Sequence, residues 1–145
     1  MDPATILSIV NGSAGLAIKC GQVVIELNEL VHKYKHAELS IRALTNECTS
    51  MKTMLDQLAT WMQSSNSSMR LDEQVWRQME SNVECGRLFT SALEADLRSL
   101  EQSTKAGNFI RRTRIVWNEG IFKEHADRIR GLNMAIAPLM MVWTR

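Results

Sequence analysis

The side chains able to act in catalysis or to bind a metal are few in this sequence, and they are scattered. The histidines are His32, His36 and His125, and the cysteines are Cys20, Cys48 and Cys85. There is no glycine-rich phosphate loop, no nucleophile elbow, no zinc-protease motif and no cysteine pair at the spacing of metal ligands. We therefore expect no enzymatic activity, no cofactor and no metal.

The histidines and cysteines are better explained as structural residues. His32 and His36 could share one helix face, but Lys33-Tyr34-Lys35 between them offers no further ligand, so we favour a solvated helix end over a metal site. His125 falls on an apolar seam, where a hydrogen-bonded core histidine is more common than a catalytic one. The cysteines are odd in number and widely spaced, which indicates buried thiols in a reducing, cytoplasmic setting.

Charge is unevenly distributed along a chain whose net charge is only +1. Residues 105–145 carry eight basic and three acidic side chains, among them the cluster Arg111, Arg112 and Arg114. This cluster is either a solvated helix face or a contact for anionic lipid headgroups, and Lys19 is a further candidate for such a contact. The charge is too local, and the aromatic residues too few, for nucleic-acid binding, which we do not expect.

The amino-terminal stretch Pro3–Ile18 has no charged side chain at all. Its apolar residues point in every direction on a helix, which is typical of a helix at the centre of a fold or in a membrane. The leading Asp2 and the interruption at Asn11-Gly12-Ser13 argue against a signal peptide. The candidate membrane-active residues of this helix are Ile6, Leu7, Ile9, Val10, Gly12, Gly15, Leu16 and Ile18.

Length decides how far the membrane interpretation can go. Sixteen residues extend about 24 Å as a helix, which is short of the ~30 Å hydrocarbon core. Extension from Ala4 to Ile25 gives about 33 Å, with Lys19 as the only charge, near enough to one end to snorkel. Small residues at four-residue spacing suit close helix packing in a membrane or in a soluble bundle. Insertion is thus physically possible but not compelled.

The spacing of apolar residues predicts an all-α fold with a single domain over residues 1–145. A first helix from Pro3 to about His32, which Gly21 could bend or divide, precedes a turn at Lys33-Tyr34-Lys35. The second helix carries an unbroken seam with steps of four and three: Ala37, Ile41, Leu44, Cys48, Met51, Leu55, Leu58 and Met62. A third helix is expected over residues 69–103, with a break at 106–108.

The end of the chain predicts two further helices. A short basic helix should end in a turn at Asn118-Glu119-Gly120. Pro138 cannot donate a hydrogen bond to the carbonyl of Met134, so a kink or an early stop is expected in the last helix. The seam of that helix is Ile121, His125, Ile129, Leu132, Ile136, Leu139 and Trp143. Together the elements predict one helical bundle of four to five helices with the apolar amino-terminal helix at its centre.

The whole pattern resembles the fungal HeLo-like N-terminal domain. The resemblance is carried by the opening Met1-Asp2-Pro3, the small and apolar first helix, and the long heptad second helix. A basic stretch ending in Trp117, followed by a short turn and a helix through Ile129, adds to it. HeLo-like domains are helical bundles of fungal signalling proteins, related to the HeLo domain and similar to the four-helix bundle of the mixed lineage kinase-like pseudokinase.

The resemblance implies an effector domain of programmed cell death in fungal immunity or heterokaryon incompatibility. It implies a C-terminal regulatory module of the NLR or STAND type in the parent protein, and homo-oligomerisation on activation. The amino-terminal helix, Pro3 to about Lys19, would then leave the bundle and perturb a plasma membrane that contains anionic lipids. The alternative is a non-lytic homotypic interaction domain that acts as an oligomerisation adaptor of a signalling receptor.

Overall fold

The computed structural model describes residues 2–63, 72–104 and 108–143, and places the side chains of all of these except 103–119 and 143. Within this part of the chain every regular element is helical, which confirms the predicted all-α class. The elements are α1 (Pro3–Lys33), the 3₁₀ turn η1 (Lys35–Ala37), α2 (Glu38–Gln63), α3 (Glu73–Thr104) and α4 (Asn108–Trp143). The fold is thus one bundle of four long helices.

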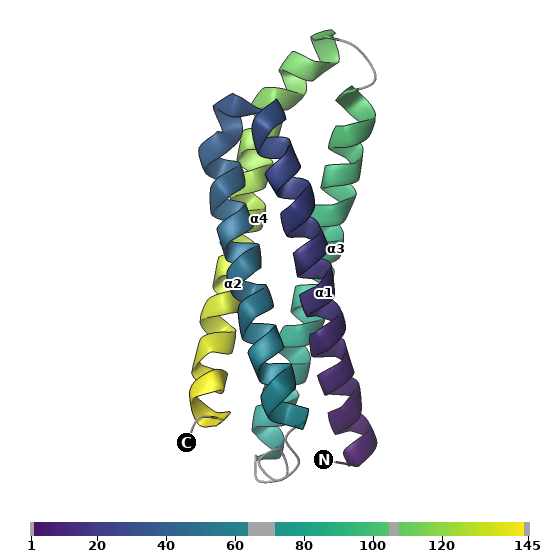
Figure 1. Cartoon of the computed structure of the whole chain (residues 1–145), viewed down its shortest axis with the longest axis vertical. Helices are drawn as coiled ribbons and strands as arrows, with labels where there is room; N and C mark the ends of the chain where they lie inside the picture. Colours follow the sequence, from purple (N-terminus) through teal and green to yellow (C-terminus); the bar gives the residue numbers. More distant parts are fainter. Residues whose placement is uncertain (1, 64–71, 105–107, 144–145) are drawn as a thin grey trace.

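The four helices alternate in direction and stand at the corners of the bundle (Figure 1). Each of α1 and α4 packs against both α2 and α3, whereas the described parts of α1 and α4 face each other diagonally. The prediction that α1 lies at the centre is therefore wrong. Among the described helices α1 packs against α2 and α3, and these two cover it from one side.

Both ends of α1 are fixed by residues close in sequence. The Asp2 carboxylate accepts a hydrogen bond of 2.8 Å from the backbone N–H of Thr5, which satisfies one of the unpaired donors of the first turn. At the other end the Tyr34 N–H donates to the Leu30 carbonyl at 3.0 Å, and the chain leaves the helix there. This confirms the predicted turn, and Gly21 does not divide the helix.

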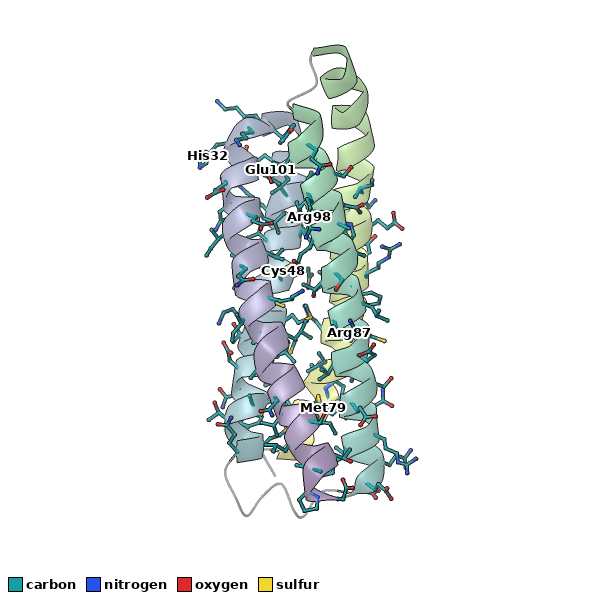
Figure 2. The ribbon with its side chains drawn as sticks, turned by 90° about the vertical axis from the view of Figure 1, so that its right-hand side faces the viewer. His32, Cys48, Met79, Arg87, Arg98 and Glu101 are labelled. Carbon is teal, nitrogen blue, oxygen red and sulfur yellow. The ribbon has the colours of Figure 1, made fainter. Side chains whose placement is uncertain are left out.

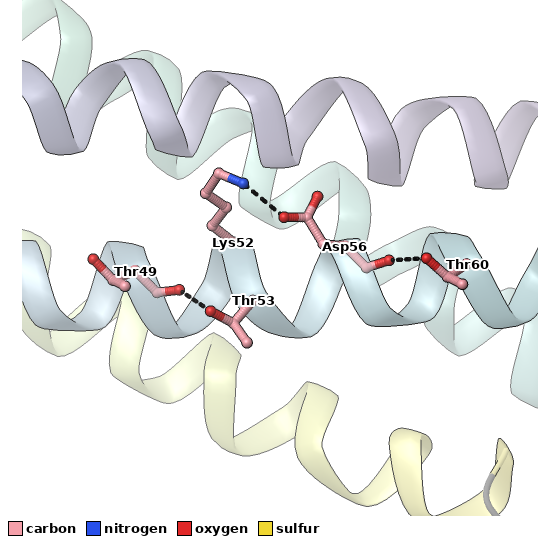
Figure 3. A network of polar contacts seen from close by, with 5 residues as sticks. All are labelled: Thr49, Lys52, Thr53, Asp56 and Thr60. Carbon is pink, nitrogen blue, oxygen red and sulfur yellow. Dashed lines mark hydrogen bonds and ion pairs between the residues drawn. The ribbon is translucent and has the colours of Figure 1, made fainter.

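The seam predicted for the second helix is confirmed, because each of its eight residues, Ala37 to Met62, is buried. On the other side of α2, threonine hydroxyls donate to the carbonyl four residues earlier, as Thr53 does to Thr49 and Thr60 to Asp56 (Figure 3). The neighbouring Lys52 ammonium pairs with the Asp56 carboxylate at 2.6 Å. The apolar side of α2 therefore faces the core.

The helix α4 is unbroken, so the predicted turn at Asn118-Glu119-Gly120 is wrong. Gly120 costs about 1 kcal/mol in a helix interior, and the packing of the residues that follow it outweighs this. The expected early stop at Pro138 is also absent, since the helix continues to Trp143. The proline removes one hydrogen bond, that of residue 138 to the carbonyl of Met134, and this loss does not end the helix.

Two buried polar contacts join α4 to its neighbours. The His125 Nε2 lies 2.6 Å from the Asp96 Oδ2 of α3, and the His125 side chain is buried. The Asn133 amide donates to both the backbone carbonyl and the carboxylate of Glu47 on α2, at 3.0 Å each. His125 is therefore the hydrogen-bonded core histidine that the sequence predicts. These contacts specify how α4 sits between α2 and α3.

Candidate functional site

The two sides of α1 differ in what they contact. Nine residues on one side are buried: Ile9, Val10, Ser13, Leu16, Ala17, Cys20, Val23, Leu27 and Val31. On the opposite side Leu7, Ile18 and Ile25 are 59%, 63% and 62% exposed. They lie seven or eleven residues apart, which aligns them on one line along the helix. Of the predicted membrane-active residues, Ile9, Val10 and Leu16 thus face the core, while Leu7 and Ile18 face outward.

The contact of α1 with α3 depends on two glycines, one on each helix. A Cβ atom at Gly12 would lie 3.2 Å from the Val83 Cγ1, and one at Gly86 would lie 2.5 Å from the Leu16 Cδ2. A Cβ at Gly86 would also lie 3.2 Å from the Leu132 Cδ2 of α4. Leu16 therefore reaches across the core into a notch that exists only because residue 86 has no side chain.

A surface trough of about 720 Å³ lies between the amino-terminal half of α1 and the facing part of α3. It exists because Ser8, Gly12 and Gly15 present little or no side chain, and a Cβ at Gly15 would meet no atom within 4 Å. Figure 2 looks onto the α1–α3 face, where Arg87 lines the trough from α3. The amino-terminal half of α1 is thus incompletely packed on this side, while α2 covers its other inward side.

The first charge after the uncharged stretch is held by an ion pair. The Lys19 ammonium lies 3.1 Å from the Glu94 carboxylate of α3, with the two side chains 47% and 26% exposed. An ion pair this exposed contributes at most about 1 kcal/mol. Lys19 thus contacts a carboxylate of its own chain, and a lipid headgroup would have to displace Glu94.

The predicted basic contacts belong to different helices, Lys19 to α1 and the arginine cluster to α4. Arg111, Arg112 and Arg114 belong to the first turns of α4, and their side chains lie outside the described residues. Those turns are at the end of the bundle where α1 finishes, and Pro3 is at the other end (Figure 1). Any contact of these arginines with lipid would therefore be separate from the uncharged half of α1.

Two of the three cysteines lie in the core close to α1. Cys20 of α1 and Cys48 of α2 are buried, whereas Cys85 of α3 is partly exposed, and all three are free thiols. Burial raises the pKa of Cys20 and of Cys48 to about 12, because the thiolate loses its hydration. The two core thiols are therefore protonated and unreactive at neutral pH, as buried structural cysteines are.

The sequence interpretation missed a second uncharged stretch at the end of α4. No charged residue occurs between Arg130 and Arg145, and the outward residues of this segment are Met134, Ala135, Ala137, Pro138, Met141 and Val142. The same charge count that singled out Pro3–Ile18 would have found it. The apolar periodicity of the last helix marks only its inward seam, and the outward residues of this segment are apolar as well.

Of the described helices, α1 alone is long and apolar enough by composition to cross a membrane, a property that core helices of soluble proteins share. His32 lies on α1 and His36 in η1, so the two are not on one helix face. In the part of the chain that is described, no three His, Cys, Asp or Glu side chains are grouped as metal ligands. No protein-family model, curated protein or solved structure matches this chain.

Proposed function

We propose that this domain is a membrane-targeting effector of regulated cell death, in which forced oligomerisation releases α1 into the plasma membrane. The observation that carries the proposal is the situation of α1. It is the apolar helix at a corner of the bundle, with exposed Leu7 and Ile18 on one side and a trough beside Gly12 and Gly15 on another. No enzymatic step, metal or cofactor is part of the mechanism.

The buried side of α1 keeps an isolated monomer closed. Six large aliphatic residues, Ile9, Val10, Leu16, Val23, Leu27 and Val31, are buried there. At ~1.5–3 kcal/mol each their exposure costs about 9–18 kcal/mol, which is as large as the stability of a whole domain. Release therefore needs an acceptor for these side chains. A bilayer that meets several copies at once supplies one, and clustering by a regulatory module would bring those copies together.

The test is dye leakage from vesicles of phosphatidylcholine and phosphatidylserine, with the full chain clustered by an inducible oligomerising tag. The variant L7E/I18E places two carboxylates on the exposed line of α1, where they leave the core untouched. The matched control L39E/L88E adds the same two charges at residues of α2 and α3 that are 84% and 52% exposed. Insertion of a charge costs roughly 2.5–3.5 kcal/mol per residue at the centre of a membrane helix.

We expect clustered wild type and L39E/L88E to cause leakage and L7E/I18E to cause none. Leakage by L7E/I18E at the wild-type rate would remove α1 from the mechanism. The alternative function, a non-lytic homotypic interaction domain, is favoured by the trough between α1 and α3, whose glycines allow a partner helix to approach closely. That alternative predicts that clustered wild type leaves vesicles intact while the untagged chain self-associates in solution.

A further inference from the structure

The outward side of α1 carries a second seam with steps of four and three residues. All residues of this outward seam are exposed and none is charged: Ala4, Ser8, Asn11, Gly15, Ile18, Gln22 and Ile25. Such spacing is typical of a helix that packs against another helix, and the buried residues of α1 lie on its opposite side. The outward seam is therefore suited to a second helix outside the bundle.

The size of the side chains changes along the outward seam. Ser8 and Gly15 in its first half are small and border the trough between α1 and α3. Ile18 and Ile25 in its second half are 63% and 62% exposed. A Cβ at Gly15 would meet no atom within 4 Å, so there is space beside this residue. The outward seam thus has room in one half and large apolar side chains in the other.

Two copies of the outward seam fit together when they run antiparallel. In such a pair the residue numbers rise along one helix as they fall along the other. A register that places Ile18 opposite Gly15 of the second copy therefore also places Ile25 opposite Ser8. A parallel pair would instead set Gly15 against Gly15 and leave the space beside it unfilled. The outward seam is self-complementary in the antiparallel orientation, as a two-fold interface requires.

The polar residues of α1 agree with the same register. Asn11 falls opposite Gln22 of the second copy, and two amides can hydrogen-bond to each other. The exposed Glu29 falls opposite Ala4, in the first turn of the second α1, where the helix dipole favours a negative charge. Parallel pairing would bring Glu29 to Glu29 and Lys19 to Lys19, which opposes like charges. The charges of α1 therefore favour the antiparallel orientation as well.

We propose that two closed bundles associate through the outward seam of α1 as an antiparallel dimer. Ile18 and Ile25 of each copy pack over Gly15 and Ser8 at the trough of the other copy. The association needs neither a membrane nor an opened bundle, so it goes beyond the proposed function. It removes from water two isoleucines that the single bundle leaves exposed.

Sedimentation equilibrium of the untagged full chain measures the dimer. Gly15→Leu fills the space that Ile18 of the second copy would use, at a position where nothing clashes within the bundle. The matched control is Gly131→Leu on α4, where a Cβ likewise meets no atom within 4 Å. We expect wild type and Gly131→Leu to dimerise equally and Gly15→Leu to raise the dissociation constant at least about tenfold. A monomeric wild type, or a Gly15→Leu variant of equal helicity that dimerises like wild type, overturns the proposal.

Disulfide trapping tests the orientation of the two helices. Ser8→Cys and Ile25→Cys are made as separate proteins in a Cys85→Ser background, which removes the partly exposed thiol. Antiparallel pairing brings residue 8 of one copy to residue 25 of the other, and leaves the two copies of residue 8 ~25 Å apart along the helices. We expect oxidised glutathione to cross-link the mixture of the two proteins and neither protein alone. Cross-linking of Ser8→Cys alone would show parallel pairing and overturn the proposal.

These results are separate from the test of the proposed function, because no vesicle is present. A dimer in solution together with leakage by clustered wild type supports both inferences. A dimer without leakage keeps the inference about α1 pairing and overturns only the membrane effector. Leakage by a clustered chain that is monomeric without its tag overturns only the dimer.

Discussion

The amino-terminal half of α1 and the end of α4 belong to the two longest uncharged stretches of this chain, and they reach the same end of the bundle (Figure 1). They are built from different residues. The α1 stretch contains Gly12 and Gly15, whereas α4 carries Met134 and Met141 on its exposed side. The first helix thus borders a trough beside its two glycines. The second also contains Gly131 and Pro138, but its inner side is buried and it has large side chains on its surface.

This difference separates a helix that borders a trough from one that is hydrogen-bonded to its neighbour. Glycine lowers the stability of a helix interior by about 1 kcal/mol per residue, and Gly12 allows α3 to approach closely. The end of α4 is instead joined to α2 through Asn133 and Glu47. Two helix segments that both lack charged residues can therefore differ in how firmly their inner sides are packed.

The thiol of Cys20 should report the opening of α1. In the closed bundle its pKa is about 12 and it is buried, so a maleimide at neutral pH should modify the partly exposed Cys85 far faster. Clustering on anionic vesicles should raise the labelling rate of Cys20 by orders of magnitude. Mass spectrometry of the labelled peptides measures the rate at each cysteine. Unchanged protection of Cys20 during leakage would mean that α1 stays in place.

The notch at Gly86 should be sensitive to one methyl group. Gly86→Ala places a Cβ against Leu16, and the overpacking of ~1–3 kcal/mol exceeds the gain in helix propensity of about 1 kcal/mol. We expect a net loss of about 1 kcal/mol in the free energy of unfolding, measured by urea denaturation. Leu16→Ala alone should cost about 2–5 kcal/mol. The double variant should lose no more free energy of unfolding than Leu16→Ala alone. A loss equal to the sum of the two single losses would show that residue 86 does not press against Leu16.

Gly15→Ala should act in the opposite direction. A Cβ at residue 15 meets no atom within 4 Å, so the substitution changes helix propensity without a clash. We expect the free energy of unfolding to rise by about 0.5–1 kcal/mol and the leakage rate of the clustered protein to fall. A thermal melt and a dye-release trace measure the two effects. A stabilised variant that leaks faster than wild type would contradict a mechanism limited by the release of α1.

The carboxylates between α1 and α3 should give a small pH dependence. Burial first, and then the charges of Glu94, Glu101 and Glu29, raise the pKa of Glu26 above its ordinary value. The folded state therefore binds this proton more tightly than the unfolded state does, and at neutral pH the ionised carboxylate destabilises the fold. Glu26→Gln should raise the melting temperature slightly at pH 7, and the gain should vanish below pH ~4.5. A gain in melting temperature that persists at low pH would show that the effect does not come from the ionised Glu26 carboxylate.

The inner surfaces of the helices were predictable from the sequence, and their positions relative to one another were not. The seam of α2 is set by residue spacing, and the cap at Asp2 by local hydrogen bonding, so both were confirmed. The corner position of α1 depends on which helices are neighbours. The notch at Gly86 depends on register between α1 and α3. Neither the helix neighbours nor the register can be read from the sequence of a single helix.

The turn expected at Asn118-Glu119-Gly120 shows a limit of a different kind. Asparagine and glycine favour a turn, but that preference amounts to about 1 kcal/mol and tertiary packing overrides it. The sequence singled out the apolar helix, of which Ile9, Val10 and Leu16 lie against the core and Leu7 and Ile18 outside it, and its membrane activity stays a prediction. Which residues face outward could not be read from a stretch that is apolar all round.

The central claim, that α1 must leave the bundle, is tested most directly by a reversible tether between α1 and α3. A Cβ at residue 12 lies 3.2 Å from the Val83 Cγ1, which is compatible with a disulfide in G12C/V83C, with Cys85→Ser to prevent mispairing. We predict that the clustered, oxidised protein binds anionic vesicles without causing leakage, and that reduction of the same sample restores leakage. Equal leakage from the oxidised and the reduced protein would contradict the release of α1.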